Sequence, residues 1–301
     1  MRILALTASL GAATLLVPLH AHAQDQAPPP EIQRLIDLWS TEASWDVVSP
    51  SDLQLPPMRP YRAVYERSYK SASGDTKGQT RNDWYIWQVE QIGWFGDAAY
   101  MVSHVDSGNP RWDDATARTH AKVIDGATHA LRFGVFPQSG TLADYAVIRS
   151  TDTGYQTTVV DTEGEASSST LATPPVFESL NAELALALMD KHEGQTLRLS
   201  YLSTRQNGTY STPYHVVGRD TMTDAQGTSH EVWVVQTPST RGRLRLMYVN
   251  DQPPYYYGTD IWDPRDDSVN PWHKLKSFTT LPDALDQEAR DASERVSSVG
   301  Q

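Results

Sequence analysis

Large and polar side chains alternate along most of this 301-residue chain, and this alternation restricts the fold more than any other feature. In residues 61–69, Tyr61, Ala63 and Tyr65 would face one side of a β-strand and Arg62 the other, because successive side chains of a strand point to opposite faces. Similar patterns predict strands at residues 82–92, 99–105, 118–125, 130–136, 144–149, 155–161, 196–202, 210–217, 229–237, 243–249 and 255–262, the last of which closes the sheet region.

The residues between these segments are typical of hairpin turns, and Asn207-Gly208 is the strongest such signal. Sequential hairpins make an antiparallel sheet, and so large a sheet with few helices must curl, close or split into two layers. We therefore predict a mainly β protein with a large curved antiparallel sheet or unclosed barrel and one or two helices packed on it. A two-layer β-sandwich is the alternative. Pro213 indicates an edge or a bulge.

Two segments have the helical pattern instead. Apolar residues recur near the helical period in residues 31–45, after which four prolines in residues 50–60 predict an extended connection. In the second segment, Phe177, Leu184 and Leu188 follow the helical spacing, and Gly194 would end that helix.

The first residues are typical of an exported protein. Arg2 precedes an apolar run, and Ala21-His22-Ala23 fits a signal-peptidase site with cleavage before Gln24. We therefore expect a periplasmic or alternatively a secreted protein, with no transmembrane segment after cleavage. The predicted regions are a signal peptide at 1–23, a linker and N-terminal helix at 24–59, a single β-rich domain at 60–280 and a polar C-terminal tail at 281–301.

Charge and composition exclude several classes of function. The formal net charge of −12 repels phosphate backbones, so we expect no nucleic-acid partner. The sequence has no Cys, which excludes disulfides and thiolate metal sites. His192-Glu193 and His230-Glu231 lack the second His of a zinc-protease motif, and we expect neither a metal nor a cofactor. Common nucleophile and phosphate-loop motifs are also missing from the sequence, which favours a non-catalytic role.

Aromatic residues are the candidate ligand-binding groups. They gather near the second expected strand and near the end of the sheet region, where rings could line a lipid cavity or stack on sugars. Packing within the sheet is the alternative for each ring. The candidates are Trp84, Trp87, Trp94, Tyr256 and Trp262.

Aspartates beside some of these rings suggest a second interpretation. Asp113 and Asp114 follow a tryptophan, and Asp260 and Asp263 flank Trp262. Paired carboxylates beside aromatic rings are typical of glycoside hydrolases, and clustered carboxylates can also hold Ca²⁺. A solvated acidic loop in residues 260–267, with Arg265 as its internal partner, is the third interpretation.

The order of the elements resembles that of known proteins. A strand begins after Pro60, residues 125–128 join two central strands, and a helix follows Pro174-Pro175. A strand pair follows Gly194, and residues 244–262 form the terminal strands. This order resembles uncharacterised periplasmic β-rich families akin to the lipoprotein localisation factors. The resemblance implies an unclosed antiparallel barrel, lidded by helices, with an apolar cavity for acyl chains. It covers about two thirds of the mature chain and carries no functional residue over.

These observations leave three functions open. The first is a non-catalytic periplasmic binding or carrier protein for an apolar or amphipathic ligand such as a lipid. The second is a protein that binds or cleaves carbohydrate with its Trp, Tyr and Asp clusters. The third is an envelope assembly partner that pairs with another protein through a strand edge.

Overall fold

The structure is a computed structural model that describes residues 30–70, 80–95, 97–106, 118–137, 145–203, 208–239, 242–265 and 267–282. The predicted signal peptide at 1–23 lies outside these residues, as do Asp113, Asp114, the turn residue Asn207 and most of the tail at 281–301. None of the described helices is long and apolar enough to cross a bilayer.

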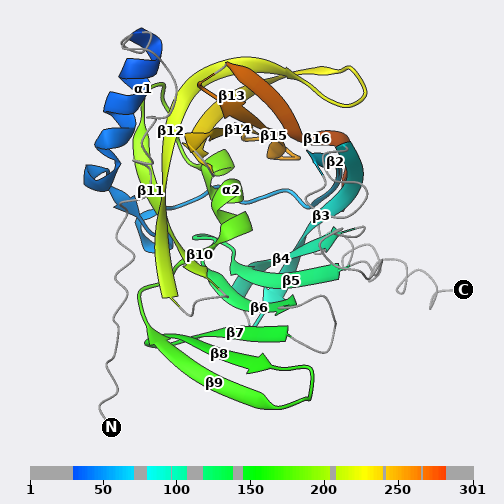
Figure 1. Ribbon diagram of the computed structural model, residues 1–301. Coiled ribbons are helices and arrows are strands. Elements are labelled where there is room, and N and C mark those ends of the chain that lie inside the picture. The colour runs from blue at the N-terminus through cyan, green and yellow to red at the C-terminus, as the bar shows by residue number, and fades with distance from the viewer. Residues whose placement is uncertain are drawn as a thin grey trace, which may run out of the picture.

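Sixteen strands of the described residues form one sheet (Figure 1). In chain order the elements are α1 (Pro30–Ser40), β1 (Val47–Val48), β2 (Tyr61–Lys70), β3 (Thr80–Trp94), β4 (Asp97–Asp106), β5 (Arg118–Asp125), β6 (Leu131–Pro137), β7 (Tyr145–Thr151), β8 (Gly154–Val160), β9 (Ala166–Ala172), β10 (Phe177–Glu178), α2 (Ser179–Leu188), β11 (Thr196–Ser203), β12 (Gly208–Thr223), β13 (Ser229–Pro238), β14 (Leu244–Val249), β15 (Tyr256–Asp263) and β16 (Ser268–Thr280). Two short 3₁₀ segments, Glu42–Ser44 and Pro50–Asp52, lie between α1 and β2.

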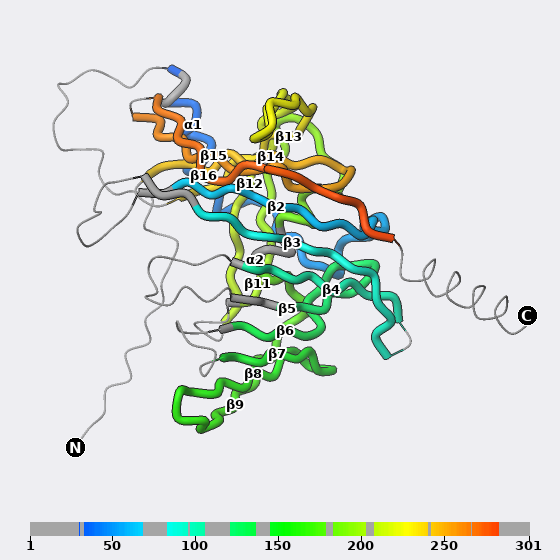
Figure 2. Tube along the Cα trace, turned by 90° about the vertical axis from the view of Figure 1, so that its right-hand side faces the viewer, coloured from blue at the N-terminus to red at the C-terminus, as the bar shows by residue number. Residues whose placement is uncertain are grey.

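The sheet curves without closing, as predicted. Its strand order is β1-β11-β12-β13-β14-β15-β16-β2-β3-β4-β5-β6-β7-β8-β9, and β10 pairs with β11 beside this path. Strands β2 to β9 follow one another down one side of the molecule and end at β9 (Figure 2). Because one continuous sheet contains all these strands, the two-layer sandwich is excluded for the described residues.

Helix α2 lies inside the curve of the sheet (Figure 1). Every side chain from Leu184 to Met189 is buried, so the C-terminal half of the helix is covered on all sides. Its sequence, SLNAELALAL, is apolar all round rather than on one face, which is typical of an enclosed helix. The Lys191 ammonium donates to the carbonyl oxygens of Ala187 and Met189 at 2.6 and 2.7 Å and thus satisfies the C-terminal end of α2.

The segment just before α2 joins two parts of the sheet that are not paired with each other, β11 on one side and β6 to β8 on the other. Leu202 of β11 packs in one small core with Leu131, Ile148 and Tyr155 of β6, β7 and β8. The Tyr155 hydroxyl donates to the carbonyl oxygen of Leu131 at 3.1 Å and accepts from the amide of Val176 at 3.0 Å. These two parts of the sheet are therefore held together by side-chain packing and by this segment, and not by pairing of β11 with β6.

In β2, the alternation of side chains correctly predicts which face lies inside. Tyr61, Ala63 and Tyr65 are each 0% exposed. Most of the predicted hairpin strands exist with shifts of a few residues at their ends. Pro213 lies in the part of β12 that pairs with β11 but extends past its pairing with β13, so it occupies an edge as predicted.

Several predictions of element boundaries were wrong. The sheet does not end with β15, because β16 follows it and joins β15 to β2. The strand β9 was not predicted, since its sequence ASSSTLA contains only small or polar residues apart from one leucine. The second helix ends at Leu188, well before Gly194, and α1 is shorter than residues 31–45.

Candidate functional site

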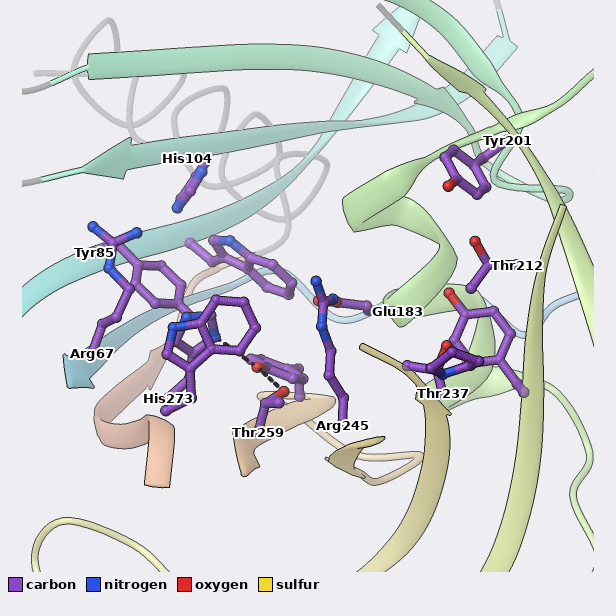
Figure 3. Close-up of a pocket in the computed structure, with 15 residues that line it drawn as sticks. Arg67, Tyr85, His104, Glu183, Tyr201, Thr212, Thr237, Arg245, Thr259 and His273 are labelled. Atoms are coloured by element: carbon purple, nitrogen blue, oxygen red, sulfur yellow. Dashed lines mark hydrogen bonds between the residues drawn. The ribbon is translucent and has the colours of Figure 1, made fainter. Parts of the chain in front are cut away.

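A cavity of about 410 Å³ lies between α2 and the concave face of the sheet. Its walls come from strands that are distant in sequence, because β16 brings the C-terminal strands beside β2. Figure 3 shows Glu183 of α2 and Arg245 of β14 near the middle of the pocket. Tyr85 and His273 lie toward one side of them, and Thr212 lies toward the other.

One wall of the pocket is made of aromatic rings. The ring centroids of Trp87 and Tyr256 are 5.2 Å apart, and the Tyr85 ring stacks at 4.9 Å on that of Tyr65, which is fully buried and does not line the pocket. The Tyr65 hydroxyl donates to the backbone carbonyl of Tyr256 at 2.7 Å, which fixes β2 against β15. Burial raises the pKa of Tyr65 and of Tyr85 well above 10, so these rings are neutral at physiological pH.

A short polar network extends from this wall. The Tyr256 hydroxyl lies 2.6 Å from Oγ1 of Thr259 and 3.0 Å from Nδ1 of His273. Burial and the nearby guanidinium groups of Arg67 and Arg245 lower the pKa of His273 well below 6.5. His273 is therefore a neutral imidazole at physiological pH, with one nitrogen engaged by Tyr256.

Glu183 is the one acidic residue of the described chain that lines the pocket. It belongs to α2, where burial of the carboxyl raises its pKa to about 7. The positive charges of Arg245 and Lys122 act in the opposite direction, and Glu178 adds to the rise. No ion pair among the described residues includes Glu183.

Arg245 enters the pocket from β14. Its guanidinium carbon lies 4.9 Å from the centroid of the Trp272 ring, which is a cation–π contact. The buried Nε atom of Arg245 has no hydrogen-bond partner in the described part of the chain. The side chain reaches from β14 toward Glu183 (Figure 3), but the two groups do not form an ion pair within 4.0 Å.

Four buried polar atoms at this pocket have no partner among the described residues. They are Nε1 of Trp87, Oγ1 of Thr237, Nε of Arg245 and Nε2 of His273. A buried polar atom without a hydrogen bond costs about 1 to 3 kcal/mol, and native proteins contain few of them. All four atoms belong to residues that line one cavity.

Two ion pairs connect secondary-structure elements around the pocket. Arg67 contacts Asp83 through two hydrogen bonds of 2.8 and 2.5 Å, which join β2 to β3. Lys122 of β5 donates to the carboxylate of Glu178 in β10, and both side chains are almost fully buried. The second pair fixes the residue that immediately precedes α2.

The five aromatic residues predicted to bind a ligand do not lie together. Trp87 and Tyr256 line the pocket. Trp84 is 43% exposed on the other face of β3, and Trp94 lies against Phe133 with ring centroids 5.9 Å apart. Trp262 donates from Nε1 to a carboxylate oxygen of Asp267 at 2.9 Å and does not line the pocket.

The predicted acidic cluster also lies away from the cavity. Asp260 accepts a hydrogen bond from the Tyr248 hydroxyl at 2.8 Å, and burial raises its pKa. Asp263 pairs with Arg265, which is the internal partner expected for a solvated loop. Asp113 and Asp114, the other aspartates of this interpretation, lie outside the described residues. No group of three or more His, Asp or Glu within the described ranges could hold a metal ion.

Sequence reasoning did not single out Glu183 or Arg245. The signal for Glu183 was a lone acid in the apolar run SLNAELALAL. Arg245 lies two residues before Met247 in β14 and therefore on the same face of the strand, and Met247 is 1% exposed and faces the interior. An ionisable residue on the buried face of a strand or helix is a candidate for function.

No protein-family model matches the sequence, and no curated protein matches it. Among solved structures, the chain is similar to the crystal structure of a β-barrel-like protein of domain of unknown function DUF1849 from Brucella abortus. The two share 11% sequence identity with a TM-score of 0.39, over 75% of this chain and 99% of that chain. The link to the lipoprotein localisation factors remains a prediction, and only the geometry of the pocket bears on function.

Proposed function

We propose that this protein is a non-catalytic binding protein that holds a small amphipathic ligand in the pocket between α2 and the sheet. The observation that carries this proposal is the meeting of aromatic walls with four buried, unpartnered polar atoms in one cavity. The cavity of about 410 Å³ is within the range of small-molecule sites, which are mostly apolar with a few convergent polar groups.

The composition of the walls favours an amphipathic ligand over a purely apolar one. The rings of Trp87 and Tyr256 offer apolar contact area, while Arg245 and His273 offer polar atoms. A purely apolar ligand would leave these polar atoms unsatisfied, at a cost of about 1 to 3 kcal/mol each. A lipid with a polar head group and a short apolar part meets both requirements.

Binding is favoured over hydrolysis because a single carboxyl lines the pocket within the described residues. Glycoside hydrolysis normally requires two carboxyl groups that flank the scissile bond. We further propose that the protein is exported by its N-terminal segment and works in the periplasm, where it carries this ligand. Fractionation of cells that express the full chain would test this location.

A neutral fluorescent probe tests the pocket itself. N-phenyl-1-naphthylamine is apolar and aromatic, and its fluorescence rises when it leaves water. We expect the purified protein to bind it, and we expect Thr212→Trp to weaken binding by about tenfold or more, which is about 1.4 kcal/mol. Thr212 lines the cavity, so the larger side chain fills the space that the probe would occupy.

The matched control is the same substitution on the same strand. Thr209 also belongs to β12, but it is exposed and does not line the pocket. Thr209→Trp should leave the affinity unchanged. No saturable binding by the wild-type protein, or an equal effect of the two substitutions, would overturn the proposed pocket.

A further inference from the structure

We infer that the ligand carries an anionic oxygen group, such as a carboxylate or phosphate, which Arg245 binds inside the pocket. This inference rests on the proposed binding function and specifies the class of its ligand. Arg245 is a guanidinium on the inner face of the sheet, and no ion pair of the described residues involves it. A partly buried cation without a counter-ion is costly, and a bound anion would remove that cost.

The position of Arg245 leaves its donors available. Its guanidinium carbon lies 4.9 Å from the centroid of the Trp272 ring, and the N–H groups of a guanidinium all lie in the plane of the fork. This plane matches the two oxygens of a carboxylate or phosphate, which arginine binds through two parallel hydrogen bonds. Its buried Nε atom is one of the donors without a partner in the described chain.

Other unpartnered atoms of the pocket are also donors. Nε1 of Trp87 can only donate, and Oγ1 of Thr237 can donate or accept. Nε2 of His273 carries the hydrogen when Nδ1 accepts from the Tyr256 hydroxyl. A pocket with this excess of donors is suited to a ligand that brings acceptor oxygens.

The other pocket arginine does not compete for the anion. Arg67 is neutralised by Asp83 through its two-point contact. A cationic ligand is disfavoured for a related reason, because two of the aromatic faces already hold guanidinium groups. Arg245 lies over Trp272, and the Arg67 guanidinium carbon lies 5.9 Å from the centroid of Tyr85.

Glu183 is compatible with an anion bound to Arg245. Burial raises the pKa of its carboxyl to about 7, so a large share of the molecules carry a neutral carboxylic acid near neutral pH. In that form Glu183 does not repel the anion and can donate a hydrogen bond to it. The pocket charge is then that of Arg245 alone.

A pair of probes with the same ring skeleton tests this inference. 8-Anilino-1-naphthalenesulfonate is N-phenyl-1-naphthylamine with an added sulfonate, which is anionic at every pH of interest. We expect Arg245→Met to weaken binding of the sulfonate probe by about tenfold or more, and to change binding of the neutral probe by less than about twofold. Arg62→Met, on the exposed face of β2, should change neither affinity.

Competition separates the two sources of the anion. Octanoate, octyl phosphate and octanol share one chain and differ in the head group, so displacement of the sulfonate probe ranks carboxylate, phosphate and hydroxyl. We expect one or both anions to displace it at concentrations at least about tenfold lower than octanol. Equal displacement by all three would overturn the inference.

The outcomes distinguish this inference from the proposed function. If neither probe binds the wild-type protein, the binding function itself is wrong. If both probes bind and Arg245→Met weakens them equally or not at all, the pocket stands and the anion assignment falls. Should Arg245→Met fail to fold, Arg245→Lys keeps the charge and loses the planar fork. It should then retain a preference for the sulfonate probe that is smaller than that of the wild type.

Discussion

Replacing Glu183 with glutamine should stabilise the protein above neutral pH. The carboxyl of Glu183 faces a set of groups from several elements, and its pKa is raised by burial from 4.5 to about 7. A shift of this size corresponds to about 3 kcal/mol, since one pKa unit is about 1.4 kcal/mol. The carboxyl lies at a cavity and is not fully covered, so we expect solvent to reduce the effect to about 1 to 3 kcal/mol.

The dependence on pH follows from proton binding in the two states. Below about pH 4.5 the carboxyl is protonated in both the folded and the unfolded protein, and it affects stability little. Between about pH 4.5 and 7 the unfolded chain loses this proton while the folded chain keeps it, so stability falls as the pH rises. Above about pH 7 the full penalty is present, and Glu183→Gln removes it.

The groups that face Glu183 define what else could contribute. Arg245 and Lys122 stabilise its charged form, and Glu178 opposes it. Buried tyrosine hydroxyls of the core also interact with it electrostatically, and they stay neutral over this range: Tyr61, Tyr65, Tyr85, Tyr214 and Tyr256.

Urea unfolding at pH 5 and pH 8.5 measures this prediction. The gain in unfolding free energy from Glu183→Gln should be larger at pH 8.5 than at pH 5. Glu231→Gln, on the exposed part of β13, is the matched control and should show no such difference. A substitution at Glu183 that destabilises the protein at pH 8.5 would refute the reasoning, because it would mean that the charged form is the stabilised one.

Two further experiments test the structure outside the pocket. Lys122→Met should lower the unfolding free energy by about 3 to 5 kcal/mol because it leaves the carboxylate of Glu178 buried without its cation, and adding Glu178→Leu should restore most of that loss. A double variant as unstable as the single one in urea unfolding would contradict this. Gly154→Ala should destabilise the β8–β9 pair by about 1 to 3 kcal/mol, since the backbone φ is +149° and an added Cβ would collide with the carbonyl oxygen of Leu171. Faster hydrogen exchange in β9 with unchanged binding of the neutral probe is the expected result, and weaker probe binding would show that this hairpin supports the pocket.

The curved sheet could be predicted because its strands obey a simple rule. Tyr85, Trp87 and Val89 alternate with exposed Trp84 in the sequence, and the structure buries all three. Strand β16 was missed because Pro271, lysines and serine interrupt its alternation, and most of its side chains are exposed. Such a strand is specified by its neighbours β15 and β2 rather than by its own pattern.

The site was less predictable than the fold because it joins residues from distant strands. The sequence identified Trp87 and Tyr256, which line the pocket, but gave no reason to separate them from Trp84, Trp94 or Trp262. Which rings face the cavity depends on the register of each strand and on how the sheet curves around α2. Glu183 and Arg245, the two charged residues of the pocket on which the proposals depend, lie in a helix and a strand whose other residues are typical of a protein core (Figure 3).

Native mass spectrometry of the protein isolated from its own cell envelope tests the central claim most directly. The wild-type protein should carry a discrete added mass that extracts into organic solvent and contains an anionic head group. Protein with Thr212→Trp should lack that mass, because the substitution fills the cavity. A wild-type protein that is bare, or the same added mass on both proteins, would contradict the account.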